Sequence, residues 1–193
     1  MGKNTVLSHF LASHPGARYS ISATTRKPRA GEKDGKNYYF YTPEQFGDLL
    51  QAGQLLEWAQ VYDEYYGTPK APPQQCLARG EIIVMDLDVQ GALAVKKSLP
   101  EAVLVFLLPP SLEDLGERMR RRGTECAQAV DRRLAAAKAE ISRARDYDYL
   151  IVNAEVSRAV AQLISIVEAE KLRVSRQSLI LSTLEEGGSI GNC

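Results

Sequence analysis

The fold class is decided by residues 81–91, which read EIIVMDLDVQG. An uninterrupted apolar run, 82–85, ends in two carboxylates and passes into a segment with helical spacing of apolar residues, 90–98. A second apolar run, 103–108, leads in the same way into an expected helix. Continuous apolar runs are typical of parallel strands that crossover helices cover on both faces. The pattern predicts an α/β fold with a parallel sheet core flanked by helices.

The segments on either side extend this alternation. Working outward, apolar spacing predicts helices at 5–13, 43–52, 111–122, 127–145 and 156–173, and strands at 19–22, 37–42, 55–62, 65–66 and 149–153. Ser111 with Asp114 is expected to cap the helix that follows. The polar segment 24–36 is expected to be a loop because of its proline and glycines, and the tail after Gln177 is expected to be frayed. The aromatic-rich residues 24–70 thus form a mixed insert in a parallel core, and a small-ligand site is expected between the two.

The composition excludes several classes of function. The 24 Lys and Arg residues balance 24 Asp and Glu residues, so no nucleic-acid partner is expected. The most apolar stretch, 102–110, is far shorter than the ~20 residues of a membrane-spanning helix, so no membrane association is expected. The cysteines are isolated, and His9 and His14 have no third ligand nearby. These features argue against a disulfide framework or a zinc site and favour a reducing, cytoplasmic location.

The first motif is Gly2-Lys3-Asn4-Thr5, at the start of an expected helix. A full phosphate-binding loop reads Gly-x-x-x-x-Gly-Lys-[Ser/Thr]; its backbone N–H groups cradle phosphate and its lysine reaches the transferred group. Only the last part of that pattern is present, so the motif predicts little by itself. Asn4 also stands where Ser or Thr normally offers a hydroxyl to magnesium.

The second motif is residues 22–29, SATTRKPR, in which Arg26 and Arg29 lie three residues apart on a loop restrained by Pro28. Two guanidinium groups so placed can converge on one phosphate, because each binds phosphate oxygens two at a time. The alternative is a solvated basic loop.

Carboxylates form the third pattern. Glu57 lies in an otherwise apolar strand, and one carboxylate can accept both adjacent N–H donors on the pairing edge of guanine. A buried carboxylate without such a partner would be costly. The alternative is a surface residue at a strand end. Asp86 and Asp88 either belong to the same site or cap the following helix.

Five arginines surround a glycine hinge between two expected helices: Arg118, Arg121, Arg122, Arg132 and Arg133. Such a segment can close over a polyphosphate and neutralise transition-state charge. The alternative is that these side chains complement the dipole at the C-terminal end of a helix. The sequence leaves open which of them touch phosphate.

Together these motifs resemble the guanylate kinase family, and the resemblance runs from Gly2 to about Arg173. Its most specific pieces, in the family's order, are residues 22–29, 31–38, 57–59, 66–68, 86–91 and 122–125. The resemblance implies transfer of the γ-phosphoryl group of ATP to GMP, with Mg²⁺ bridging the ATP phosphates. It implies ATP and GMP as partners of a monomer or a weak homo-oligomer.

The resemblance also assigns roles to residues. The GMP site would comprise Ser22, Arg26, Arg29, Tyr38, Glu57, Tyr66, Thr68 and Asp88. In it, the arginines and tyrosines would bind phosphate, and Glu57, Ser22 and Thr68 would read guanine with support from Asp88. The ATP site would comprise Gly2, Lys3, Asn4, Thr5, Arg118, Arg122 and Asn153. The catalytic groups would be Lys3, Arg118, Arg122 and Arg133, and Asn4 and Asp86 would hold Mg²⁺ through water.

The implied architecture is a P-loop-type core (1–23, 71–118 and 146–177), a mixed-β GMP-binding insert (24–70), a helical lid (119–145) and a tail (178–193). The family's first strand and most of its phosphate loop are missing ahead of Gly2. Either the natural protein begins upstream or this chain is an impaired kinase that still binds GMP. Ala154 replaces a usual acidic residue, and Pro72-Pro73 depart from the helix usual in that place.

Two other functions compete with this interpretation. The first is a catalytically impaired guanylate kinase-like module that binds GMP or a peptide. A module that binds only peptides has no need of a guanine-reading carboxylate. The second is a kinase for a different nucleoside monophosphate, which fits poorly with Glu57 and the aromatic insert.

Overall fold

The apolar runs that dominate the sequence form parallel strands, as predicted, in a computed structural model that describes residues 2–61, 63–121 and 127–189. Strand β1 (Ala17–Tyr19) pairs with β6 (Ile82–Val84), and β7 (Val105–Leu108) pairs with β8 (Tyr149–Val152). Among the described residues these are two separate two-stranded sheets. The parallel α/β prediction is therefore confirmed, with the core strands divided into two pairs.

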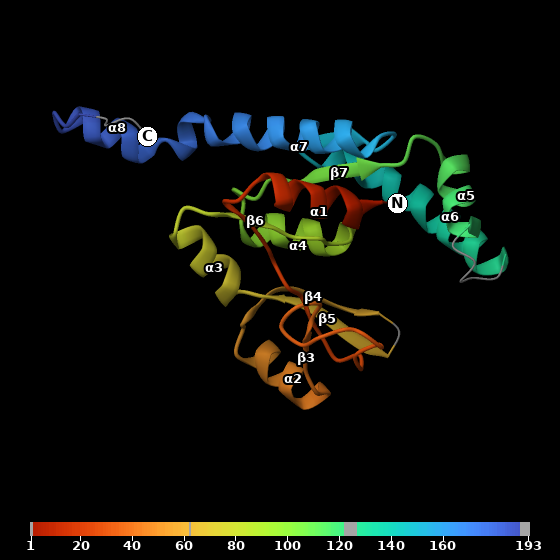
Figure 1. Cartoon of the computed structure of the whole chain (residues 1–193). Coiled ribbons are helices and arrows are strands. Elements are labelled where there is room, and N and C mark those ends of the chain that lie inside the picture. Colours follow the sequence, from red (N-terminus) through yellow and green to blue (C-terminus); the bar gives the residue numbers. More distant parts are fainter. Residues whose placement is uncertain (1, 62, 122–126, 190–193) are drawn as a thin grey trace.

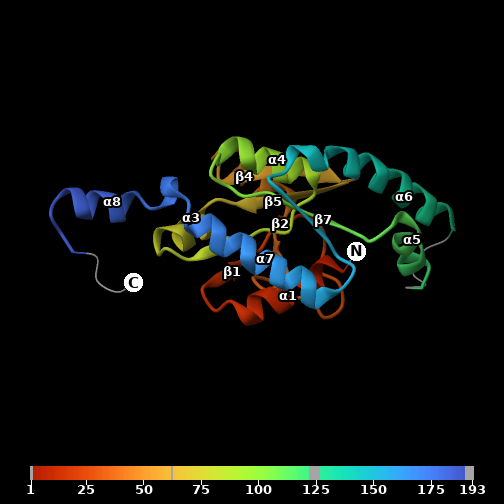
Figure 2. The same ribbon diagram turned by 90° about the horizontal axis from the view of Figure 1, so that it is seen from above.

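Helices cover both faces of the core strands. Figure 2 shows α1 (Lys3–Ser13) and α7 (Val156–Lys171) together on one side of β7, and α4 (Val89–Ser98) on the other. Phe10 of α1 is 1% exposed and shares a core cluster with Ile151 of β8 and Ala159 of α7. This packing fixes the start of α1 at the carboxyl ends of the strands.

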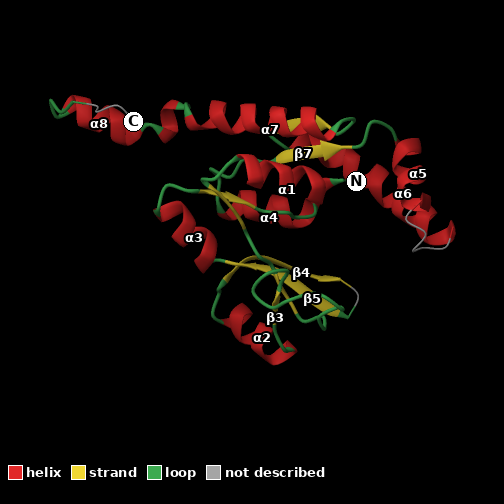
Figure 3. Ribbon diagram, in the orientation of Figure 1, coloured by secondary structure: helices red, strands yellow, loops and turns green. Residues whose placement is uncertain are grey.

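The insert is a sheet with a core of its own. Its strands β2 (Ala23–Thr24), β3 (Tyr39–Phe40), β4 (Leu55–Val61) and β5 (Glu64–Pro69) have the spatial order β3-β2-β5-β4, with a parallel β2–β3 pair and antiparallel neighbours elsewhere. Helix α2 (Pro43–Gln51) covers one face, and its Phe46 is fully buried with Ala23 and Leu55. Figure 3 shows this sheet and α2 as a body set apart from the parallel strands.

Two expectations about helices were wrong. Residues 71–78 form helix α3 (Ala71–Ala78) in spite of Pro72 and Pro73, because both prolines lie in the first turn, where an N–H has no partner within the helix. The tail is not frayed throughout. After a short 3₁₀ turn, η2 (Val174–Arg176), helix α8 (Ser178–Glu185) forms and extends beyond the end of α7 (Figure 1).

The remaining helices form a hairpin. Helix α5 (Leu112–Arg121) begins with the expected cap, in which the Asp114 N–H donates to Ser111 Oγ at 3.0 Å. Helix α6 (Ala127–Ser142) ends earlier than predicted and continues as η1 (Arg143–Asp146). Figure 1 places this hairpin on the side of the molecule where α1 begins. None of the helices in the described residues has the length and apolar character needed to cross a membrane.

Strand boundaries differ most from the predictions. The strand expected at 19–22 lies at 17–19, and the strand expected at 37–42 is confined to 39–40. The extent of a strand depends on its hydrogen-bonding partner, and β6 offers β1 only a short edge. Such a partner cannot be read from local periodicity.

Candidate active site

Glu57 is held by a cross-strand partner. It lies on β4 directly opposite Thr68 of β5, and the Thr68 hydroxyl donates to Glu57 Oε1 at 2.6 Å. Thr68 is only 1% exposed, so this bond is shielded from water. The register shifts by a bulge between Leu55 and Glu57. The bond fixes one carboxylate oxygen and leaves the other, Oε2, for a further donor.

The first turn of α4 closes the other side of this carboxylate. Asp88 caps the helix by accepting a hydrogen bond from the Gly91 N–H at 2.8 Å. A Cβ atom at Gly91 would lie 3.1 Å from Glu57 Oε2 and 3.3 Å from Asp88 Oδ1. Glycine therefore allows the core helix to approach the insert's carboxylate closely. Gly91 ends the motif 86–91, but its role could not be predicted from the sequence, because the contact joins segments far apart in the chain.

Burial raises the pKa of the Glu57 carboxyl above its ordinary value of 4.5. The Thr68 hydrogen bond lowers the pKa, and the charge of nearby Asp88 raises it further. The ionised carboxylate is thus only partly compensated by its neighbours. A ligand that brought N–H donors to Oε2 would relieve that cost.

Aromatic rings surround Arg26. Its guanidinium carbon lies 5.4 Å from the centre of the Tyr38 ring and 5.8 Å from that of Phe40. Tyr38 in turn meets Tyr66 edge to face, with 6.2 Å between ring centres. The structure thus brings together three of the four side chains predicted to bind phosphate.

Glu32 organises the same loop. It accepts from Arg26 Nη2 at 3.0 Å through one oxygen and from the Arg29 N–H at 2.7 Å through the other. The Glu32 carboxylate raises the pKa of the Arg26 guanidinium, and the Tyr66 hydroxyl acts in the same direction. The Arg29 side chain is exposed, so the expected convergence of both guanidinium groups is not seen. The sequence did not predict these two hydrogen bonds of Glu32, because nothing in it distinguishes Glu32 from a solvent-exposed glutamate on a loop.

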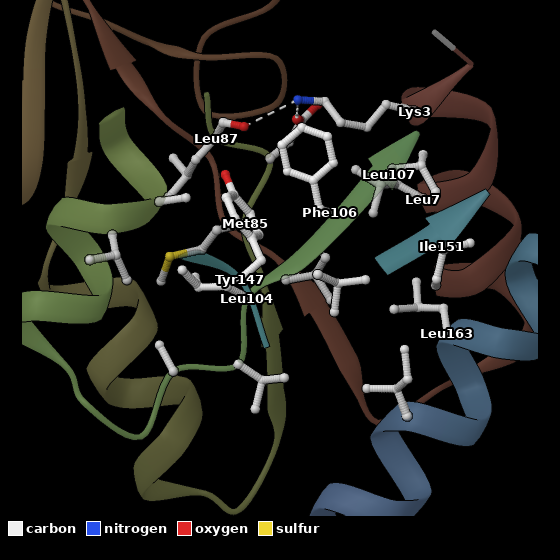
Figure 4. Close-up of a pocket in the computed structure, with 18 of the residues that line it drawn as sticks. Lys3, Leu7, Met85, Leu87, Leu104, Phe106, Leu107, Tyr147, Ile151 and Leu163 are labelled. Carbon is white, nitrogen blue, oxygen red and sulfur yellow. Dashed lines mark hydrogen bonds and ion pairs between the residues drawn. The ribbon is translucent and has the colours of Figure 1, made fainter. Parts of the chain in front are cut away.

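The start of α1 faces the carboxyl ends of the core strands. Gly2 has φ +75°, and a Cβ atom there would lie 3.1 Å from the Asn153 side-chain nitrogen. Lys3 Nζ forms an ion pair with Asp86 and donates to the Leu87 carbonyl at 3.3 Å (Figure 4). Asn4 and Thr5 are exposed. Thus Gly2, Lys3, Asp86 and Asn153 lie together.

Asp86 also connects the core to the insert. Its charge raises the pKa values of Tyr38 in the insert and of Tyr19 at the end of β1, although burial is the larger cause for both. The pKa of Tyr19 reaches about 12. The Asp86 carboxylate is therefore close enough to Tyr38 of the Arg26 cluster for its charge to act on that side chain. Tyr19 was not among the predicted site residues.

The donor set around Asp86 suits a weakly held magnesium ion. Among the described residues, no group of three or more His, Cys, Asp or Glu side chains could hold a metal by itself. Mg²⁺ in nucleotide sites usually keeps several waters and is bound by one or two carboxylates plus substrate phosphates. One carboxylate beside a lysine fits that mode, whereas Asn4 offers only an exposed amide.

For two of the predicted lid arginines, the structure gives the position of the helix and not of the side chain. Arg118 lies on α5 and Arg133 on α6, which pack against each other, and their side chains are not among those described. Arg122 lies outside the described residues.

Ser22, predicted to belong to the GMP site, lies between β1 and β2, and its carbonyl accepts from the Tyr39 N–H at 2.9 Å.

Known proteins resemble this chain over most of its length. The guanylate kinase family model matches residues 1–170. The chain is 41% identical over 186 residues to a guanylate kinase of Clostridioides difficile (strain 630), covering 96% of this chain and 91% of that protein. It is 46% identical over 191 residues to a guanylate kinase of Symbiobacterium thermophilum, covering 98% and 90%. A crystal structure of guanylate kinase from Anaplasma phagocytophilum superposes with a TM-score of 0.78 at 34% identity, covering 95% and 89%.

The match spans the core, the insert and the helical hairpin, and it includes every described residue of the site. This chain belongs to the guanylate kinase family of enzymes, which transfer a phosphoryl group from ATP to GMP.

Proposed function

We propose that this chain phosphorylates GMP in the space between the insert and the core, with the base on Glu57 and the phosphate at Arg26. The observation that carries the proposal is the sheet register. Tyr66 and Thr68 lie two residues apart on β5, so their side chains point from the same face, about 7 Å apart. One mononucleotide can therefore reach both the Glu57–Thr68 pair and the Arg26–Tyr38–Tyr66 cluster.

Guanine would be recognised through the free side of Glu57. The Oε2 atom and the remaining lone pair of Oε1 accept the two adjacent N–H donors of the base, while Thr68 keeps the carboxylate in place. Asp88 supports the site by capping α4, and Ser22 borders it where the chain enters the insert. Adenine presents an amino group and a ring acceptor on the same edge, so one ring nitrogen would face the carboxylate unfavourably.

The GMP phosphate would bind to Arg26, Tyr38 and Tyr66, and Arg29 would join from the loop. Arg26 now donates to Glu32, so the phosphate has to share or replace that carboxylate. The rings beneath the guanidinium hold its plane in position, which reduces the entropy lost on binding.

ATP would lie at the start of α1, with Gly2, Asn4, Thr5 and Asn153 around the phosphates and Lys3 near the transferred group. When bound, Mg²⁺ would neutralise charge on the ATP phosphates, and Asp86 would hold it through water. Residues 119–145 would act as a lid over the ATP phosphates. From this hairpin of helices, Arg118, Arg122 and Arg133 would approach the phosphoryl group. Catalysis then consists of aligning the two substrates and placing cationic donors around the phosphoryl group, without a protein nucleophile.

The division of the chain follows from this scheme. Residues 24–70 have a core of their own, which supports a GMP-binding insert that moves as a unit on the core (1–23, 71–118 and 146–177). The tail, 178–193, would lie apart from the site. We infer a monomeric or weakly associating protein in the cytoplasm, and the free, buried Cys76 supports the cytoplasmic location.

A coupled assay of ADP formation with ATP and Mg²⁺ tests the proposal. GMP should support turnover and AMP should not, and titration calorimetry should show the same preference in binding. Binding of GMP without turnover would instead favour the impaired module. Equal binding of GMP and AMP would refute the base site.

A further inference from the structure

Lys3 and Asp86 neutralise each other's charge. Lys3 Nζ forms an ion pair with Asp86 Oδ1 and donates to the Leu87 carbonyl at 3.3 Å, and Figure 4 shows the Lys3 ammonium beside Leu87. The Lys3 side chain is 33% exposed and the Asp86 side chain 16%. Because water screens this pair only in part, its attraction is stronger than that of an ion pair on the open surface.

The Asp86 carboxylate is short of hydrogen-bond donors. Its Oδ1 atom is buried, and apart from the ion pair with Lys3 no donor among the described residues reaches it. An ionised carboxylate has roughly four lone-pair sites, and a buried one is normally hydrogen-bonded. Asp86 therefore has unused capacity for further donors, of the kind that the water shell of a hydrated Mg²⁺ supplies.

The Lys3 ammonium is also only partly used. It has three donors, and two of them are directed at Asp86 and Leu87. A phosphate oxygen that attracts the ammonium competes with the Asp86 carboxylate for the same charge. If the phosphate gains Lys3 and nothing replaces it at Asp86, a partly buried carboxylate loses its counter-charge, and that loss is costly.

We propose that the Lys3–Asp86 ion pair makes this site select a magnesium-bound nucleoside polyphosphate over the same polyphosphate without metal, with Asp86 as the specificity-determining residue. The inference rests on the proposed function, because it takes the ATP phosphates to lie at the start of α1. A metal-free polyphosphate engages Lys3 only by leaving Asp86 uncompensated, and that carboxylate then repels the phosphates. Asp86 therefore acts against the wrong form of the ligand as well as for the right one.

The magnesium complex avoids this conflict. It presents an anion to Lys3 and a hydrated cation to Asp86 at the same time, so both charges stay compensated when the ion pair loosens. Mg²⁺ alone has the opposite difficulty, because binding to Asp86 would leave Lys3 without its counter-charge. Metal and polyphosphate thus raise each other's affinity for the chain, and by the same factor.

Titration calorimetry of the full chain with ADP, in EDTA and in excess Mg²⁺, tests the proposal. The wild-type chain should bind ADP at least about tenfold more tightly with Mg²⁺ than without it. Asp86→Asn should bind metal-free ADP at least about tenfold more tightly than the wild type, and its two conditions should agree within about threefold. A residue that served only to hold metal, or only to support the fold, would give no such gain. Metal-free binding that is no tighter in Asp86→Asn would refute the proposal.

Asp48→Asn is the matched control. Asp48 is exposed on α2 of the insert, so its substitution removes the same charge without touching the ion pair. Because water and salt screen an exposed charge, both dissociation constants for ADP should stay within about twofold of the wild-type values. An equal gain in metal-free binding for the two variants would indicate an effect of net charge and would contradict the assigned role of Asp86.

Lys3→Gln provides a second measurement, which also serves if Asp86→Asn does not fold. Without the ammonium, the Asp86 charge is available to a cation, so electron paramagnetic resonance with Mn²⁺ alone should show at least about threefold tighter binding than in the wild type. Unchanged Mn²⁺ binding would overturn the proposal.

Titrations of the same preparations with GMP separate this inference from the proposed function. Normal GMP binding together with ADP binding that does not depend on Asp86 would refute the role of the ion pair and leave the GMP site standing. Failure of the wild-type chain to bind GMP would refute the proposed function itself. ADP that binds to none of the chains, with or without Mg²⁺, would refute the selectivity inferred from Asp86.

Discussion

Replacement of Glu57 by glutamine tests the base site most directly, because it changes one charged oxygen to an amide at nearly constant shape. The amide oxygen can keep the 2.6 Å bond from Thr68, which places the NH₂ group where Oε2 now faces Gly91 and the open site. One N–H of guanine would then meet a donor in place of an acceptor. Loss of one charge-assisted hydrogen bond, with a buried donor left without a partner, costs about 2–4 kcal/mol.

This cost corresponds to a rise of about 30- to 1,000-fold in the Kd for GMP. Titration calorimetry with GMP, and with IMP, which lacks the amino group on the pairing edge, measures it. The wild-type chain should prefer GMP to IMP, and Glu57→Gln should lose most of that preference. Binding of GMP within about threefold of wild type would refute the assigned role.

Glu64→Gln is the matched control. Glu64 lies on the neighbouring strand and also accepts from a threonine hydroxyl, that of Thr25, at 2.6 Å. It has the same local chemistry without the contact to α4. If both substitutions weaken GMP binding alike, the effect comes from the sheet and not from base recognition.

Four further outcomes follow from the same geometry. Gly67→Ala places a Cβ atom 2.9 Å from the Glu57 carbonyl oxygen, so it should lower the free energy of unfolding by about 1–3 kcal/mol in denaturant titrations. The control Gly47→Ala, which has open space around it in α2, should be neutral or stabilising. Gly91→Ala should raise the KM for GMP several-fold with little change in Tm, because its Cβ atom would crowd Oε2 of Glu57 at 3.1 Å; an unchanged KM would contradict the contact. Arg26→Lys should reduce the advantage of GMP over guanosine in binding by about tenfold, because a lysine lacks the planar fork; equal loss for both ligands would indicate a merely structural role. Because burial raises the pKa of Glu57, acidification should begin to weaken GMP binding at a pH above 4.5. The protonated carboxyl stabilises the fold, and this stability should be lost as pH rises through the raised pKa. Glu57→Gln should therefore have a higher Tm than the wild-type chain at neutral pH, and thermal melts should show this difference shrinking toward pH 4.

The Glu57 carboxylate links stability to function. A partly compensated buried acid costs folding free energy at neutral pH, and it is retained where binding uses it. Thr68 and Asp88 act on its pKa in opposite directions, and under the proposal a donor-bearing base would stabilise the carboxylate. The Arg26–Glu32 pair is a comparable case in the proposed phosphate site, because an internal carboxylate holds the guanidinium in place.

The sequence alone was sufficient for the fold class and for most of the chemistry. Apolar runs at 82–85 and 103–108 predict parallel strands, because a strand covered on both faces can tolerate few polar side chains. Glycine and proline marked the turns of the insert, and the types of residues in the motifs pointed to phosphate and purine recognition. These signals are local, so they can be read from neighbouring positions.

Only the tertiary structure decided which groups meet. The pairing of Glu57 with Thr68 and its contact with Gly91 join three segments that no local pattern connects. The selection of Arg26 over Arg29 for the aromatic cluster has the same origin. Hydrogen-bond register and packing are properties of segments far apart in the chain, so the sequence specified the chemistry available and the fold specified where it is used.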